Sequence, residues 1–303
     1  MEKSQLHNLF IDKNIGAVLF DEPMKNHTSF KIGGPADVMI IPGGEDELLN
    51  AVKFCRENNI QFYIMGNGSN LLVKDGGMRG AVIKISEGLN KIEVRGNTIY
   101  NEAGALLTGV SRAAMANSLT GFEFANGIPG SIGGAITMNA GAYGGEMKDI
   151  VTKVRAIDTN SNIVEYTKDE MNFRYRGSKV VDDGLIVVSV EIGLEPGVYE
   201  EIEETVKELT FKRTSKQPLE LPSAGSTFKR PVGYFAGKLI QDSGLRGLRL
   251  GGAQVSEKHC GFVVNIDNAT CKDVLQLISV VQKTVRDNYG VELDTEIKII
   301  GED

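Results

Sequence analysis

The order of apolar and polar residues along the chain predicts a protein that mixes helices and strands. In some stretches apolar residues recur at three- and four-residue spacing, which is typical of amphipathic helices; in others they form short β-branched runs, which are typical of strands. The expected helices cover residues 45–58, 106–119, 199–212, 234–243 and 270–289. The expected strands cover residues 38–41, 60–64, 82–85, 92–94, 98–100, 151–157, 163–164, 186–192, 255, 262–264 and 291–300, with turns at Gly96–Asn97 and at Asp158–Asn162.

The last part of the chain has the clearest pattern. Thr270 and Asp273 are spaced as a capping box at the start of a helix, and Gly290 is a typical helix end. The core face of this helix is expected to carry Val274, Leu277, Ile278, Val281 and Val285. Residues 291–300 then alternate between apolar and charged positions, which predicts a strand with Glu296 on its charged face.

A glycine-rich loop, Gly66 to Asn70, follows the predicted strand 60–64. Its two glycines let consecutive backbone N–H groups turn toward one anion, and its serine and asparagine add side-chain donors. An ordinary glycine-rich turn fits these residues equally well. The loop lacks the Gly-Lys-Ser/Thr of a P-loop, and Leu71 stands where a dinucleotide-binding fingerprint needs its third glycine.

A second glycine-dense segment covers residues 121–144 and is long and apolar as well. Glycines among Ile, Phe and Ala indicate backbone pressed against a flat, apolar group such as an aromatic cofactor. A tightly packed core loop explains the same composition almost as well.

Composition narrows the class of protein. The 303 residues suffice for two or three domains, and a hydrophobic content of 41% is normal for a folded soluble chain. The net charge of −7 argues against a nucleic-acid surface. No apolar run approaches the ~20 residues of a membrane helix, and residues 1–7 lack the features of a signal peptide, so a cytoplasmic protein is expected. Cys55, Cys260 and Cys271 have neither metal-ligand spacing nor a disulfide framework.

Four motifs follow one another along the chain: Asn26–Ala36, Gly66–Val73, Gly127–Ala135 and Asn139–Gly144. Together, and in this order, they resemble the UDP-N-acetylenolpyruvoylglucosamine reductase family. The resemblance runs along essentially the whole chain. It implies an α+β protein with the FAD-binding fold of the vanillyl-alcohol-oxidase type.

The resemblance also implies a domain organisation and an activity. Residues 1–95 and 96–196 would be two FAD-binding lobes, and residues 197–303 a substrate-binding domain. The family reduces the enolpyruvyl group of UDP-N-acetylglucosamine enolpyruvate to UDP-N-acetylmuramate with NADPH, in cytoplasmic peptidoglycan synthesis. This oxidoreductase step serves cell-wall biogenesis, cell shape and cell division.

The resemblance assigns FAD to the two glycine-rich segments. The pyrophosphate would lie on Gly66, Asn67, Gly68, Ser69 and Asn70. The rest of the cofactor would lie along Gly127, Ile128, Pro129, Ser131, Gly133, Gly134, Asn139 and Gly141. Asn67 and Ser69 stand where several oxidases of this fold carry a flavin-linked histidine, so non-covalent FAD is expected. The chain has no fingerprint for NADPH, which fits the family's alternating use of one site.

Three residues correspond to the family's catalytic groups. Arg176 would hold the substrate carboxylate, Ser226 would donate a proton, and Glu296 would polarise or orient the intermediate. Residue patterns alone leave other interpretations open: Arg174 and Arg176 could be an exposed pair on one face of a strand, Ser226 a turn serine, and Glu296 a solvated charge.

The implied substrate contacts are Tyr175, Lys216, Lys229 and Arg230. Arg230 replaces an asparagine found in many family members, and Thr295 replaces the usual proline before the catalytic glutamate. The chain lacks the long tyrosine-bearing insertion and so resembles the shorter subclass, which leaves the residue that closes over the sugar nucleotide unidentified.

Two other functions stay open at the level of sequence. One is a different FAD-linked oxidase of the same fold, and the other is a catalytically silent nucleotide-binding protein. Metal ions, nucleic acid and membranes are not expected partners, and the oligomeric state is not readable from the residues.

Overall fold

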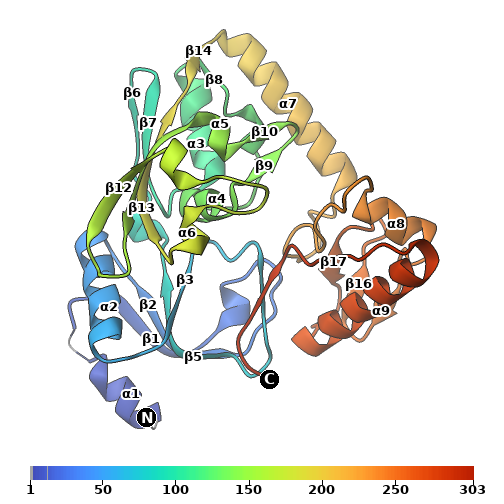
Figure 1. Ribbon diagram of the computed structural model, residues 1–303, viewed down its shortest axis with the longest axis horizontal. Coiled ribbons are helices and arrows are strands. Elements are labelled where there is room, and N and C mark those ends of the chain that lie inside the picture. Colours follow the sequence, from blue (N-terminus) through green and yellow to red (C-terminus); the bar gives the residue numbers. More distant parts are fainter. Residues whose placement is uncertain (1–2, 12) are drawn as a thin grey trace. The chain divides into compact units, whose positions relative to one another are not determined.

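The computed structural model describes residues 3–11 and 13–303, so the expectation about residues 1–7 lies partly outside the described residues. The chain forms two compact units. Unit 1 comprises Met1–Leu19, Met39–Asn67 and Ala81–Arg213, and unit 2 comprises Phe20–Val38, Gly68–Gly80 and Thr214–Asp303. Figure 1 shows the elements in sequence colours.

Three strands of one four-stranded sheet contribute residues to both units. They are β1 (Ala17–Pro23), β2 (Pro35–Ile41) and β5 (Met78–Lys84), and the sheet order is β1-β2-β5-β3. The edge strand β3 (Phe62–Met65) runs parallel to β5, with Tyr63 opposite Val82. The predicted helix 45–58 is confirmed as α2 (Glu45–Glu57), whose first turn is acidic as the helix dipole favours.

The main sheet of unit 1 has five antiparallel strands in the order β12-β11-β13-β7-β6. These strands are β6 (Ile92–Arg95), β7 (Thr98–Glu102), β11 (Val151–Ile157), β12 (Ile163–Thr167) and β13 (Ile186–Gly193). The predicted turns at Gly96 and at Asp158–Asn162 close its two hairpins. The central strand β13 is almost wholly buried, which explains its continuous apolar run.

Two helices cover this sheet. They are α3 (Leu107–Ala116) and α4 (Ile132–Met138), and both pack against its strands (Figure 1). The sequence pattern predicted α3 but not α4, which forms inside the second glycine-dense segment. The long helix α7 (Tyr199–Lys216) runs four residues beyond its predicted end. The short elements of unit 1 are α1 (Lys3–Leu9), β8 (Leu119–Thr120), β9 (Gly141–Ala142), β10 (Gly145–Glu146), α5 (Met147–Ile150), α6 (Lys179–Asp182) and β14 (Glu195–Pro196).

Unit 2 is built around helix α9 (Cys271–Tyr289). The capping box of Thr270 and Asp273 is present, and Gly290 ends the helix in the left-handed conformation. The helix packs against a small antiparallel sheet and against α8 (Ala236–Asp242). The sheet consists of β15 (Arg249–Leu250), β16 (Ala253–Val255) and β17 (Val263–Asn265). A separate pair joins β4 (Leu71–Val73) in parallel to β18 (Lys298–Ile300).

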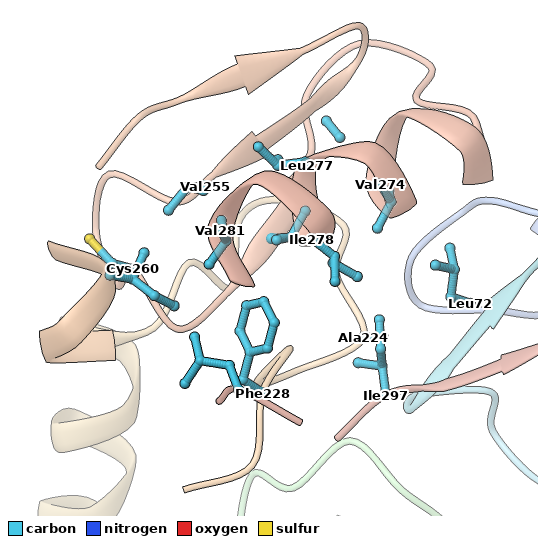
Figure 2. Close-up of a cluster of buried hydrophobic side chains, with 14 of the residues drawn as sticks. Leu72, Ala224, Phe228, Val255, Cys260, Val274, Leu277, Ile278, Val281 and Ile297 are labelled. Atoms are coloured by element: carbon cyan, nitrogen blue, oxygen red, sulfur yellow. The ribbon is translucent and has the colours of Figure 1, made fainter. Parts of the chain in front are cut away.

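The core of unit 2 forms where the predicted apolar stripe of α9 is buried. Figure 2 shows Val274, Leu277, Ile278 and Val281 of this stripe clustered with Phe228, Ala224 and Ile297. Val274, Leu277 and Val281 have no solvent exposure. Burial of each such side chain contributes about 1.5–3 kcal/mol of hydrophobic stabilisation, so α9 is held mainly by this face.

The predicted strand over residues 291–300 is wrong for most of its length. Only Lys298–Ile300 is a strand, while Leu293 and Ile297 are buried and Ile299 is 37% exposed. The alternation failed because residues 294–296 pair with a loop rather than with a sheet.

The described residues also bear on membrane spans, metal sites and disulfide bonds. Among the helices of residues 3–11 and 13–303, none combines the length and apolar character of a membrane span. The same residues contain no cluster of three or more side chains suited to hold a metal ion. All three cysteines are free and buried.

Candidate functional site

The first half of the glycine-rich loop, Gly66 and Asn67, belongs to unit 1 and contacts the second glycine-dense segment. The Asn67 amide donates to the Pro129 carbonyl at 2.8 Å. A Cβ on Gly66 would overlap the Ser131 hydroxyl, so only glycine fits here without displacement. The structure therefore brings together two of the segments predicted to bind the cofactor.

The second half of the loop, Gly68 to Asn70, belongs to unit 2. Gly68 has φ +64°. The side-chain amide of Asn70 donates to the Glu296 carbonyl at 3.3 Å, and the backbone carbonyl of Asn70 accepts from the Lys298 N–H at 2.9 Å. Within the described part of the chain, the N–H groups of Asn67, Gly68 and Ser69 donate to no protein acceptor. Such a run of available donors fits the pyrophosphate of a dinucleotide.

The segment Gly127–Gly134 has little space for side chains on its protein side. A Cβ on Gly133 would lie 3.1 Å from the Ala103 Cβ, and the Gly133 N–H donates to the Ala103 carbonyl at 2.8 Å. Gly134 differs, because its nearest neighbour would be the Ser131 hydroxyl at 3.7 Å. Backbone that is fixed on one side and open on the other suits close approach of a flat ligand.

Asn139 is buried and uses its whole amide within unit 1. Its nitrogen donates to Glu146 at 2.8 Å and to the Arg174 carbonyl at 3.2 Å, and its oxygen accepts from the Lys148 N–H at 2.9 Å. Gly141 lies against β10, where a Cβ would come within 2.7 Å of the Gly145 carbonyl oxygen. Both residues thus fix the backbone in the last part of the second glycine-dense segment.

The expectation that Arg174 and Arg176 share a face of a strand is wrong. Residues 174–177 form a tight turn in which Arg174 and Gly177 exchange two backbone hydrogen bonds, at 3.0 and 3.2 Å. Arg174 forms an ion pair with Asp182 at 2.6 Å. Arg176 occupies the left-handed conformation at φ +57°.

Two contacts fix this turn and its surroundings in unit 1. The Ser178 hydroxyl donates to the Thr137 carbonyl in α4 at 3.2 Å. The Arg176 guanidinium lies 5.2 Å from the ring centroid of Tyr175, which is 54% exposed. The turn that carries Arg176 is therefore attached to the same segment as Gly133 and Gly134.

Ser226 and Glu296 belong to unit 2 and lie on two paired segments. The Glu296 N–H donates to the Thr227 carbonyl, and the Lys229 N–H to the Asp294 carbonyl, both at 2.8 Å. Phe228 and Thr295 face each other between these bonds. Gly225, at φ +79°, precedes the half-buried Ser226. Asn70 bonds the Glu296 carbonyl, so the second half of the glycine-rich loop, Gly68 to Asn70, adjoins this pair within unit 2.

The remaining predicted contacts are also in unit 2. Lys216 is exposed at the end of α7, and Lys229 is half-buried beside the Ser226 segment. The Arg230 guanidinium lies 4.0 Å from the ring centroid of Phe235.

Arg213 directly follows the predicted helix 199–212, and the sequence pattern assigned it no role. It is 8% exposed, and its burial lowers the pKa of the guanidinium. Its guanidinium donates to the Gly127 carbonyl at 2.9 Å. A signal was present, because position 213 continues the apolar stripe of Ile202, Val206 and Leu209 at helical spacing.

Two family models match the chain. An FAD-binding domain matches residues 36–167, and the C-terminal domain of UDP-N-acetylenolpyruvoylglucosamine reductase matches residues 217–300. The described fold is thus a mixed α+β FAD-binding domain followed by this C-terminal domain.

Whole-chain relatives agree with these models. The UDP-N-acetylenolpyruvoylglucosamine reductase of Alkaliphilus oremlandii is 57% identical over 94% of both chains. That of Alkaliphilus metalliredigens is 50% identical over 100% of both chains. The crystal structure of the Thermus caldophilus reductase superposes with a TM-score of 0.81 at 34% identity and covers 93% of this chain and 98% of its own. The chain belongs to the UDP-N-acetylenolpyruvoylglucosamine reductase family, whose members are FAD- and NADPH-dependent oxidoreductases that form UDP-N-acetylmuramate for peptidoglycan.

Proposed function

We propose that Arg176, Ser226 and Glu296 carry the reduction of the enolpyruvyl group in this chain. The observation that supports this most directly is the pairing of residues 227–229 with 294–296, which fixes Ser226 and Glu296 on adjacent segments. When bound, FAD supplies the two-electron carrier between NADPH and the substrate double bond. The protein must then stabilise negative charge beside the substrate carboxylate and deliver one proton.

FAD would be held by backbone on two sides. The loop Gly66–Asn70 offers N–H donors for the pyrophosphate, and the open side of Gly134 offers space for the remainder. The other assigned residues of this segment, Gly127, Ile128, Pro129, Ser131 and Gly133, would shape that surface. Asn139 and Gly141 would act through the backbone that they order. No histidine lies in the loop, which supports non-covalent binding.

Arg176 would neutralise charge on the substrate carboxylate. A guanidinium pairs with a carboxylate through two parallel hydrogen bonds, and stabilisation aimed at developing charge is commonly a large catalytic contribution. Its left-handed backbone supports the assignment, since strained non-glycine residues persist where the surroundings enforce them and often lie at functional sites.

Ser226 would transfer its hydroxyl proton to the substrate carbon beside the carboxylate. The oxygen left behind carries negative charge, which the nearby segment can offset through the Lys229 ammonium. Glu296 would orient the carboxylate and the intermediate from the paired segment. General-acid catalysis of this kind is worth roughly 10²–10⁴-fold in rate.

The proposed domain roles follow the matched segments. Residues 1–95 and 96–196 would hold FAD, and residues 197–303 would bind the sugar nucleotide. Tyr175, Lys216, Lys229 and Arg230 would contact the substrate. A cytoplasmic location would give the enzyme access to NADPH.

The decisive experiment follows the flavin spectrum of the purified protein under anaerobic conditions. NADPH should bleach the visible absorbance, and UDP-N-acetylglucosamine enolpyruvate should restore it. An FAD oxidase would instead need no NADPH, and its reduced flavin would be reoxidised rapidly once oxygen is admitted. A silent nucleotide-binding protein would show no change with NADPH.

Replacement of the proposed proton donor separates the two half-reactions. Ser226→Ala should leave bleaching by NADPH nearly unchanged and slow substrate-dependent recovery by about 10²–10⁴-fold. Ser223→Ala, in the same segment, is the matched control, because among the described residues Ser223 is bonded through its backbone carbonyl, which accepts from the Ser29 hydroxyl, and not through its side chain. Equal losses in both half-reactions of Ser226→Ala would refute the assigned role.

A further inference from the structure

Arg213 is a buried cation without a carboxylate partner among the described residues. Its side chain donates to the Gly127 carbonyl at 2.9 Å and to the Tyr143 hydroxyl, and the Tyr143 ring centroid lies 6.0 Å from the guanidinium carbon. Its Nε is buried and has no hydrogen-bond partner in the described part of the chain. Burial of a charge without an ionised partner is costly, so a compensating function is expected for it.

The contact with Gly127 is close and specific. A Cβ on Gly127 would lie 3.1 Å from the Arg213 Cδ and 3.3 Å from its Nε, so the arginine fills the space that a side chain would need. One helical turn earlier, the Thr210 hydroxyl accepts a hydrogen bond from the Asn126 amide at 2.8 Å. Thr210 and Arg213 share one face of α7, and together they hold the consecutive residues Asn126 and Gly127 of the second glycine-dense segment.

Tyr143, the second partner of Arg213, has an unusual backbone. It forms the two-residue turn between β9 and β10 with Gly144, and the two residues have φ +53° and +96°. Such turns favour asparagine followed by glycine, whereas a bulky aromatic residue rarely adopts this conformation. A tyrosine at this position is explained if its ring and hydroxyl are needed, and both contact Arg213.

We propose that Arg213 is a positioning residue for FAD. It holds Gly127, the first residue of the stretch Gly127–Gly134, in the conformation that binds the cofactor, and Tyr143 is its second partner. This inference rests on the proposed role of Gly127–Gly134 in cofactor binding. A charge-assisted donor in a desolvated position restrains a carbonyl more strongly than a neutral donor does. The planar guanidinium can serve Gly127 and Tyr143 at once, which the ammonium of lysine does less well.

The test compares FAD affinity among variants of the full chain. Flavin is removed, and FAD is titrated back while its fluorescence is followed. Arg213→Met should raise the FAD dissociation constant about 10- to 100-fold, as expected for loss of a hydrogen bond from a charged donor. Arg213→Lys should restore part of the affinity, and Tyr143→Phe should lie between Arg213→Met and the wild type.

Two further measurements distinguish positioning from a general effect on folding. At saturating FAD, Arg213→Met should still take up one FAD per chain, as the wild type does, and the urea midpoint of its apoprotein should change less than its FAD affinity. Lys212→Met is the matched control, because Lys212 is 45% exposed on the same helix and pairs with Glu208; it should bind FAD as the wild type does.

Unchanged FAD affinity in Arg213→Met would overturn the proposal. So would an affinity loss that merely follows the urea midpoints of all variants. If the wild-type protein itself binds no FAD or does not oxidise NADPH with the substrate, the proposed function fails instead, so the two failures are distinguishable.

Discussion

Gly66→Ala tests whether the glycine-rich loop is built as its contacts indicate. The backbone at Gly66 is outside the left-handed region, so alanine can adopt it without torsional strain. The obstacle is steric, because the new Cβ would overlap the Ser131 hydroxyl. Either Ser131 or the loop must move, and both belong to segments proposed to bind FAD.

The size of the effect follows from the packing. Overpacking by one methyl group typically costs about 1–3 kcal/mol, which corresponds to roughly a 5- to 150-fold weaker FAD affinity if the displacement acts on the binding conformation. Removal of the Ser131 hydroxyl should relieve the overlap, since the Ser131 Cβ would lie 3.4 Å from the new methyl group, within ordinary contact. The double variant Gly66→Ala/Ser131→Ala should therefore bind FAD more tightly than Gly66→Ala alone.

A double-mutant cycle of FAD affinity, measured by fluorescence titration, gives the coupling between the two sites. Gly44→Ala is the matched control, because a Cβ there would meet no atom within 4 Å in an extended backbone. Additive losses from the two single substitutions would refute the steric explanation, as would a Gly66→Ala variant with wild-type affinity.

Two predictions concern titratable groups. Hydrogen bonds, first from the Thr270 N–H, lower the pKa of Asp273, so its stabilising contribution is present above the unfolded value of ~3.9 and is lost as pH falls through the folded value. The wild type should therefore exceed Asp273→Asn in urea midpoint at neutral pH, with a difference that shrinks below about pH 4; a difference independent of pH would contradict this. Burial raises the pKa of Cys55 and of Cys271 to about 12 each, so at pH 8 both should be alkylated far more slowly in the folded than in the urea-unfolded protein, as mass spectrometry would measure. Equal rates in both states would show that these thiols are not protected.

Local patterns predicted most of the helices and strands because their causes are local. The capping box and apolar stripe of α9 and the turn at Gly96 depend on neighbouring residues, and all were found where the sequence placed them. The alternation in residues 291–300 misled because it reflects two buried side chains, Leu293 and Ile297, rather than a sheet. The short helix α4 was missed because its glycines weaken the helical pattern, while packing against β13 and β7 stabilises it.

The candidate site was predictable as a set of motifs but not as a set of contacts. Nothing in the sequence indicates that Asn70 bonds the Glu296 carbonyl, since 226 residues separate the two. The turn of Arg176 was taken for a strand because its aromatic and basic residues alternate, whereas backbone bonds between Arg174 and Gly177 decide the local structure. Arg213 was visible as a cation near a helix end, but its burial depends on Gly127 and Tyr143, which are distant in the sequence.

The departure at Thr295 illustrates why contacts matter more than motif identity. Between the paired segments, the bonds are donated by the N–H groups of Glu296 and Lys229, so the ladder does not use the N–H of residue 295. A proline, which lacks this N–H, can occupy such a position without loss of a hydrogen bond. Threonine and proline are therefore interchangeable for the pairing, and the backbone that presents Glu296 is fixed by its own N–H and by the Asn70 amide. The same reasoning does not extend to Arg230, whose guanidinium lies over the Phe235 ring and carries a charge in place of a neutral amide. If Arg230 contacts the substrate as proposed, that departure would change the chemistry of the contact rather than the backbone that presents it.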